Sequence, residues 1–526
     1  MKIFKKKFEV DEDFLLVTSL LYIYIPIVIF LFLWTKIYIA APVVVAVTFC
    51  LYAMISEVRK NRENVFTGEV IIRPNVWIFI LLSLVILVFC YYMGWSGDAP
   101  QTSDWPKHNA VLRDLINYDW PVYYYLGNRS MLTYYIGQYI IPAFAGKMAG
   151  GSFEVAQYVM LFWNYIGIML TFCWIIVLTR AVSSKRQIAC TFMLFFFGGA
   201  LPVAQIIVTS WFEVGFFHEF DYFRFLNYDS IYLQYRSNIT DMRWVFQQCI
   251  VPWLSILLFY RYKNYRKHYM VMLLPNMLYA TLAFIGSAFM AIFEAISSIV
   301  KRIKEKLKVS VIIKEIFSIQ NILMFLTFGS VMILYFWGNV FSEKPDNMSF
   351  EFQLTSIEFL FTYVVFALCM FGLHGICIYR KYKANATYYI VMGILTVIPL
   401  FKMGFWNDWC MSLSIPPLMV LMIMIIRYLF DEVHNAAEGF RRGILVALLA
   451  IGALYPIMET TQIIKADDFQ EKQECDWYYS LSQFANRDRE DANDDLKYNY
   501  YSYDLENNIF VNYIARESDE KAGTIR

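Results

Sequence analysis

The chain has 526 residues, of which 59% are hydrophobic and 19% aromatic, and its formal net charge is +1. That composition excludes an ordinary soluble domain and is typical of a polytopic membrane protein. The balanced charge gives no reason to expect a nucleic-acid partner, and the nine cysteines follow no metal-ligand spacing.

Apolar stretches long enough to cross a bilayer recur along the chain. The first, residues 14–34, is too long for a cleaved signal peptide and is followed at once by another, so we expect it to remain as an anchor. We predict an all-α transmembrane bundle with about eleven spans: residues 14–34, 37–56, 76–93, 155–179, 188–209, 245–260, 322–341, 357–379, 388–402, 412–430 and 443–463.

Two further apolar stretches do not fit as simple crossings. Basic residues gather at 5–7, 59–73, 180–186 and 261–268, and the positive-inside rule places these loops in the cytoplasm. Residues 132–148 are then predicted to form a helix lying on the outer membrane surface. Residues 269–300 separate two basic clusters, so we predict a short re-entrant pair of helices bent near Pro275 or Gly286.

This topology places the N-terminus in the cytoplasm and the C-terminus outside. Abundant Lys, Ile, Asn and Tyr suggest an AT-rich genome and hence a bacterial plasma membrane. The tail becomes acidic, polar and rich in tyrosine. We expect it to form a small cap with residues 510–515 as its apolar contact, the alternative being a disordered segment. The predicted parts are a two-span anchor with a cytoplasmic loop (1–75), a module with extracytoplasmic loops at 94–154 and 210–244 (76–268), the C-terminal spans (269–463) and the extracytoplasmic tail (464–526).

The first outside loop carries the strongest candidate for chemistry. Four ionisable residues follow directly on an apolar span: Asp98, Asp104, Lys107 and His108. Ionisable groups next to the membrane are costly, so we take them as candidates for a functional site. Asp104 and His108 stand four residues apart and would share one face of a helix, as a general base and its orienting partner do. The alternative is a helix start with Asp104 as N-cap and Pro106 in the first turn, and both can hold together.

Two other outside segments carry candidate binding residues. The loop at 210–244 interleaves aromatics with Arg224, Arg236 and Arg243, and arginine can grip a lipid phosphate through paired donors. The loop at 403–411 holds Asn407 and Asp408 between two tryptophans, where a carboxylate needs a partner. The alternative for this last pair is a cap for the span that follows.

The order of these features resembles that of the GT-C membrane glycosyltransferases: a span, an acidic outside loop with D-x-x-x-H, a Trp-Pro step at 120 and 121, a surface helix and a span ending in a basic turn. The resemblance covers residues 76–261. The stretch DWPKHNAVLRDLINYDWPV is also similar to bacterial multispan proteins without an assigned role. Two preceding spans and the absence of a large soluble C-terminal domain depart from the family pattern.

The resemblance implies transfer of a hexosyl or pentosyl group from a polyprenyl-phosphate donor to a glycan, lipid or protein acceptor. The catalytic carboxylate falls on Asp104, with Asp98 competing and His108 as neighbour. Arg243 first, then Arg236 or Lys107, would neutralise the departing phosphate; the alternative is a divalent cation, Mg²⁺ or Mn²⁺, between the two aspartates. Competing functions are a lipid-linked glycan polymerase or ligase, and a transporter or flippase.

Overall fold

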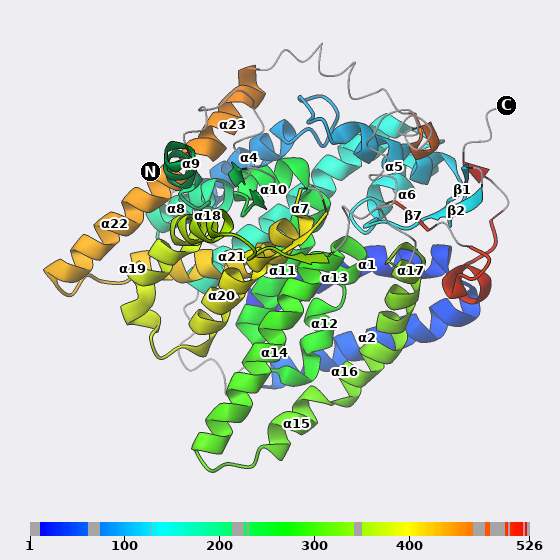
Figure 1. The fold of residues 1–526 in the computed structure, drawn as a ribbon. Helices are drawn as coiled ribbons and strands as arrows, with labels where there is room; N and C mark the ends of the chain where they lie inside the picture. Colours follow the sequence, from blue (N-terminus) through cyan, green and yellow to red (C-terminus); the bar gives the residue numbers. More distant parts are fainter. Residues whose placement is uncertain are drawn as a thin grey trace.

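The computed structural model describes residues 11–61, 74–126, 128–212, 226–228, 231–340, 350–404, 406–465, 479–483, 500–502, 505–518 and 521–522. These residues form a helical bundle with small strands at its periphery (Figure 1). Within them, nine helices are long and apolar enough to cross a membrane, so the chain is a multi-pass membrane protein.

The helices, in chain order, are α1 (Glu12–Trp34), α2 (Ile37–Lys60), α4 (Val76–Tyr92), α5 (Trp105–Asn117), α6 (Ile140–Met148), α7 (Phe153–Thr179), α8 (Ser184–Phe196), α9 (Leu201–Trp211), α10 (Asn238–Trp244), α11 (Phe246–Tyr262), α12 (Tyr269–Leu273), α13 (Asn276–Tyr279), α14 (Thr281–Lys304), α15 (Ser310–Ile316), α16 (Ile319–Met324), α17 (Ser330–Val340), α18 (Ile357–Ala367), α19 (Leu373–Tyr382), α20 (Ala386–Val397), α21 (Asp408–Phe430), α22 (Ala436–Gly452) and α23 (Leu454–Lys465). Short π-helical segments join α16 to α17 (Phe325–Gly329) and α18 to α19 (Leu368–Gly372), and a third lies in the tail (Phe510–Ile514).

Local capping explains where several helices begin. Asn75 accepts from the backbone N–H groups of Trp77 and Ile78 at the start of α4, and Ser152 accepts from Val155 at the start of α7. Each cap satisfies an N–H group that the first helical turn leaves without an internal partner.

The nine long helices match eight of the predicted spans. The ninth is α14, which the sequence assigned to the re-entrant pair, while α4 and the segment Ala386–Leu400 are shorter apolar helices. The span predicted at 188–209 is broken between α8 and α9. The backbone N–H of Ala200 there donates to the carbonyl of Cys369, and the carbonyl of Phe197 accepts from the backbone N–H of Asn238, so two polar groups of the break have partners outside it.

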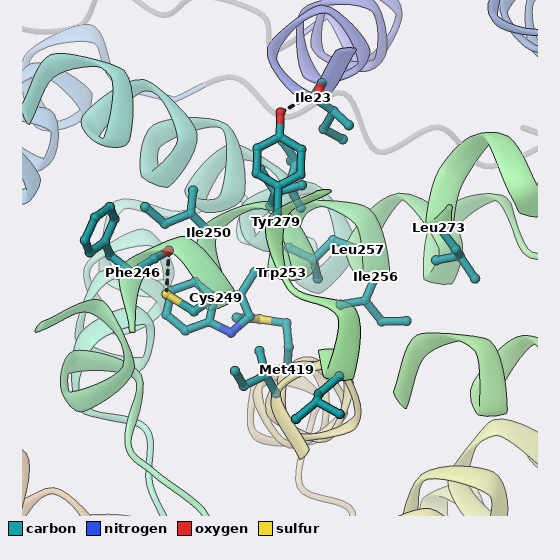
Figure 2. Close-up of a cluster of buried hydrophobic side chains, with 14 of the residues drawn as sticks. Ile23, Phe246, Cys249, Ile250, Trp253, Ile256, Leu257, Leu273, Tyr279 and Met419 are labelled. Carbon is teal, nitrogen blue, oxygen red and sulfur yellow. Dashed lines mark hydrogen bonds between the residues drawn. The ribbon is translucent and has the colours of Figure 1, made fainter. Parts of the chain in front are cut away.

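The stretch after α11 bends at Pro275, one of the two predicted positions, between α12 and α13. Tyr279 donates to the carbonyl of Ile23, in the middle of α1, which fixes the bend deep in the bundle (Figure 2). Gly286 instead lies inside α14, where a side chain would collide with the carbonyl of Leu413 on α21. Lys263 at the end of α11 donates to Glu294 of α14 at 3.0 Å. The basic clusters on either side of this stretch therefore lie at the same end of the molecule.

The prediction of one surface helix over residues 132–148 is wrong in its first half. Residue 132 ends a strand, the chain then turns, and only Ile140–Met148 is helical. The backbone explains the difference: the N–H of Thr133 donates to Tyr500 and that of Gly137 to Leu278. Partners outside the segment thus take hydrogen bonds that a helix would have kept inside it.

The strands among the described residues make three small sheets. The largest has the order β7-β2-β1-β8, in which β1 (Tyr123–Leu126) and β2 (Asn128–Leu132) form a hairpin, β7 (Tyr501–Ser502) adds antiparallel to β2, and β8 (Lys521–Ala522) adds parallel to β1. Figure 1 shows this sheet beside α5 and α6. The others pair β3 (Leu226–Tyr228) with β4 (Ile231–Leu233), and β5 (Phe350–Phe352) with β6 (Phe401–Met403).

The described parts of the tail pack onto the bundle. Phe510 is fully buried and meets the ring of Tyr335 on α17 edge-on. The carbonyl of Ile514 accepts from Lys36, between α1 and α2. Residues 510–515 therefore make the apolar contact that the sequence assigned to them.

Candidate functional site

Asp104 stands at the N-cap position of α5 and Pro106 lies in the first turn, as the alternative interpretation of the first loop requires. Its carboxylate does not cap the helix. Instead it accepts from the ammonium group of Lys107 at 3.1 Å, with 37% of the Asp104 side chain and 15% of the Lys107 side chain exposed. Asp104 therefore stands at a helix start, and its carboxylate is accessible and lies beside a cation.

His108 lies on α5 but is buried, with 4% of its surface exposed. Its Nδ1 lies 2.6 Å from the hydroxyl of Tyr139, and the ring also bonds to the backbone of Trp244. Burial lowers the pKa of His108 to about 4, against the opposing effect of Asp104. The neutral imidazole, bonded in this way, joins α5 to Tyr139 before α6 and to α10. The side-chain partner of the Asp104 carboxylate is Lys107.

Asp98, the competing carboxylate, is engaged elsewhere. Its backbone N–H donates to Ser96 Oγ at 3.3 Å, and its carboxylate accepts from Tyr158 of α7. Within the described part of the chain, no three His, Cys, Asp or Glu residues gather closely enough to hold a metal ion. Asp98 and Asp104 are therefore not part of such a group, and no step below uses a divalent cation.

Asn407 is a helix cap, the alternative considered for the third loop. It adopts a left-handed conformation with φ 56°, and its side-chain oxygen accepts from Cys410 at the start of α21. Its amide group donates to the carbonyl of Tyr232 at 2.8 Å. With both ends of this fully buried amide occupied, Asn407 fixes the loop against β4.

Asp408 begins α21, and charged residues of two other loops that were predicted to lie outside act on it. The charges that act on it most strongly come from Arg236, Asp104 and Lys107. The loop carrying Arg236 is held to the loop carrying Asp408, because Gln234 donates to the carbonyl of Asn407 and accepts from Arg236 Nε at 3.0 Å. Two carboxylates and two cations from distant parts of the sequence are thus brought into one electrostatic cluster.

The structure places the remaining arginines differently. Arg243 lies 3.9 Å from Glu459 of α23, whose carboxylate also accepts from Thr240 at 2.7 Å and from Trp244 Nε1 at 3.0 Å. Its charge is therefore balanced inside the protein, which removes the reason for ranking it first as a phosphate ligand. Arg224 lies outside the described residues.

Three residues near this cluster were not predicted from sequence. The ring of Tyr500, in the tail, packs against that of Tyr134 in a tilted arrangement, with ring centroids 4.4 Å apart. Burial raises the pKa of the Tyr500 hydroxyl most, and the charges of Asp104 and Asp408 raise it further. Asp241 is buried on α10, where burial raises its pKa to about 7 and Arg236 opposes the rise. Asp241 stands two residues before Arg243, so a search for acids beside outside arginines would have found it; no sequence signal marks Tyr500 or Tyr134.

Comparison of the chain with protein-family models, with curated proteins and with solved structures gives no match. The fold and the cluster define a multi-pass helical membrane protein with charged side chains gathered at one end of the bundle.

Proposed function

We propose that the protein is a membrane glycosyltransferase that moves a sugar from a polyprenyl-phosphate donor to an acceptor hydroxyl at the outer membrane face. The observation that carries the proposal is the cluster of Asp104, Lys107, Arg236 and Asp408, drawn from three separate outside loops. A partly exposed carboxylate paired with a lysine, near a second carboxylate that an arginine faces, suits a reaction in which a hydroxyl loses a proton and a phosphate leaves.

The acceptor oxygen attacks the anomeric carbon, and the bond from that carbon to the donor phosphate oxygen breaks with its electron pair. Asp104 takes the hydroxyl proton, and the phosphate carries the electron pair away on its lipid. Lys107 and Arg236 replace Arg243 as the cations placed to balance the phosphate charge, since Arg243 is paired with Glu459. A single base acting once favours inversion at the anomeric carbon.

The test uses membranes that contain the protein and radiolabelled polyprenyl-phosphate sugars, with transfer of label and release of lipid phosphate measured together. Asp104→Asn keeps the shape of the side chain and removes the base, so transfer should fall by about 10²–10⁴-fold at an unchanged protein level. Asp98→Asn is the matched control, because its carboxylate bonds to Tyr158, and it should retain transfer.

Full transfer by Asp104→Asn would remove Asp104 from the role of base. Loss of transfer in Asp98→Asn alone would move the base to Asp98. If the wild-type protein transferred no sugar from any lipid tested, the glycosyltransferase proposal would fail and transport would become the better explanation.

A further inference from the structure

Two basic clusters flank residues 269–300, and the structure uses their charges differently. In the first cluster, residues 261–268, each of the four cations pairs with a carboxylate of another helix. The pairs are Arg261 with Glu12 at 2.6 Å, Lys263 with Glu294 at 3.0 Å, Arg266 with Glu315 at 3.0 Å and Lys267 with Glu57 at 3.3 Å. The protein itself therefore balances the charge of this cluster.

The second cluster, residues 301–308, keeps its charge at the surface. It forms the turn from α14 to α15 at the edge of the bundle (Figure 1), and its five cations and one acid give a net charge of +4. Lys301 lies 3.9 Å from Glu305, with 75% and 48% of their side chains exposed. Among the described residues, Lys304, Lys306 and Lys308 are exposed and form no ion pair. We call residues 301–308 the basic corner.

Backbone hydrogen bonds give the basic corner a defined shape. Lys306 adopts a left-handed conformation with φ 56°, and the N–H of Leu307 donates back to the carbonyl of Arg302 at 2.8 Å. The guanidinium of Arg302 donates to the carbonyl of Lys308 at 3.2 Å. These bonds satisfy carbonyl groups at the end of α14, so the cations are presented on an ordered turn.

An apolar stripe of α14 leads to the basic corner. Ile292, Ile296, Val300 and Ile303 are all exposed, and their spacing of three or four residues places them on one face of the helix. Leu307, within the corner, is exposed as well. Because α14 is long and apolar enough to cross a membrane, this exposed stripe is suited to contact lipid. The cations beside its last members then lie at the depth of the lipid headgroups.

We propose that the basic corner binds anionic phospholipid headgroups of the leaflet that it faces. Lys304, Lys306 and Lys308 contact the phosphates, and Ile303 and Leu307 insert among the acyl chains beside them. Charge complementarity selects an anionic partner, because the cations have no counter-charge in the described part of the protein. The apolar side chains between them select a lipid surface, which offers both kinds of contact. The inference does not depend on sugar transfer.

The test measures lipid binding to the purified full-length protein in nonionic detergent by native mass spectrometry. The probe is an equimolar mixture of phosphatidylglycerol and phosphatidylcholine, and the wild type should bind phosphatidylglycerol in preference. A triple variant with Lys304→Gln, Lys306→Gln and Lys308→Gln should bind phosphatidylglycerol at least about tenfold more weakly, because each lysine near an anionic surface contributes about fivefold. Its binding of phosphatidylcholine should stay the same.

Two matched variants separate charge from shape. Replacing the same three lysines by arginine keeps every charge and should retain the preference for phosphatidylglycerol. Glu305→Gln removes the one acid of the basic corner and should tighten phosphatidylglycerol binding severalfold. Thermal unfolding without added lipid should be unchanged in all the variants, since the side chains that they alter are exposed.

Equal binding of the two lipids by the wild type would overturn the inference and favour an acidic soluble partner as the occupant of the corner. Unchanged phosphatidylglycerol binding in the glutamine variant would place the lipid elsewhere on the protein and overturn it too. Loss of the preference in the arginine variant would contradict a role for charge. None of these results depends on transfer activity, so failure of the proposed function would leave the inference standing.

Discussion

At the scale of single residues, burial gives His108 a chemistry that an exposed imidazole does not have. The ring is enclosed by the aromatic side chains of Trp105, Tyr139 and Phe246, and its pKa falls to about 4. At neutral pH it is therefore an uncharged connector between α5, α6 and α10. His108 therefore serves as a connector, and the proposed role of general base stays with Asp104.

This lowered pKa predicts a pH dependence of stability. Between about pH 6.5 and pH 4 the unfolded chain binds a proton at His108 that the folded chain does not, so the folded state loses stability as the pH falls through that range. The loss for this one residue amounts to about 3 kcal/mol. Thermal unfolding in detergent should show it as a steeper acid dependence for the wild type than for His108→Gln.

The comparison with the variant is necessary because Asp114, with a pKa raised to about 7 by burial, titrates nearby with the opposite sign. Its folded form holds the extra proton and loses stability as the pH rises from about 4 to 7. That contribution is common to both proteins and cancels. Parallel stability curves for wild type and His108→Gln would show that His108 binds its proton equally well in the folded state.

At the scale of elements, one carboxylate joins α23 to α10, the short helix before α11. Glu459 of α23 accepts from Thr240 and Trp244 of α10 and lies beside Arg243, while the exposed fractions of the paired side chains are 11% for Arg243 and 6% for Glu459. The sequence analysis assigned Arg243 to the departing phosphate, a role that would affect donor use more than folding. The pairing predicts a larger effect on stability.

Glu459→Ala leaves the Arg243 charge buried without its counter-ion, and the free energy of unfolding should fall by about 3–5 kcal/mol. Arg243→Ala should cost a similar amount, and the double variant less than the sum, by about 1–3 kcal/mol. The measurement is a double-mutant cycle by thermal unfolding. Lys301 and Glu305 of α14 are the matched control, because their atoms are also 3.9 Å apart but 75% and 48% exposed, so their coupling should be close to zero. Additive costs for Arg243 and Glu459 would contradict the pairing.

At the scale of the whole molecule, the candidate site depends on which end of the bundle faces outward. The basic loops predict that the α14–α15 corner is cytoplasmic and that the tail, with Tyr500, lies outside. Lys306 and Glu506 are exposed representatives of the two ends. Cys475, which lies outside the described residues, is first replaced by serine so that it cannot react. In that background Glu506→Cys should react with a membrane-impermeant maleimide in intact cells, and Lys306→Cys only after permeabilisation.

The native cysteines favour this measurement, since seven of the eight described ones are buried and the eighth, Cys173, is partly so. The reverse labelling pattern would mean that the opposite end of the bundle faces outward and that the cluster faces the cytoplasm. The proposal of a lipid-linked donor used at the outer face would then have to be abandoned.

The sequence by itself determined the features that depend on neighbours along the chain. Runs of apolar residues fix most of the spans, because a bilayer requires a minimum length of apolar helix. Pro275 marks the bend after α11 and Asn407 the start of α21, since proline and a capping amide act within one helical turn. The apolar segment at 510–515 already indicated where the tail makes contact.

Only the tertiary structure decided which polar groups meet. Trp244 and Glu459 are 215 residues apart, and Tyr500 reaches Tyr134 only because β7 adds to β2. The local sequence pattern cannot select such partners, because each polar side chain could bond to many others in the chain. The packing of the bundle decides which of them lies close enough. For the same reason the sequence could name Asp104 and Lys107, which stand three residues apart, while the electrostatic interaction of Asp408 with Asp104 and Arg236 is a property of the fold.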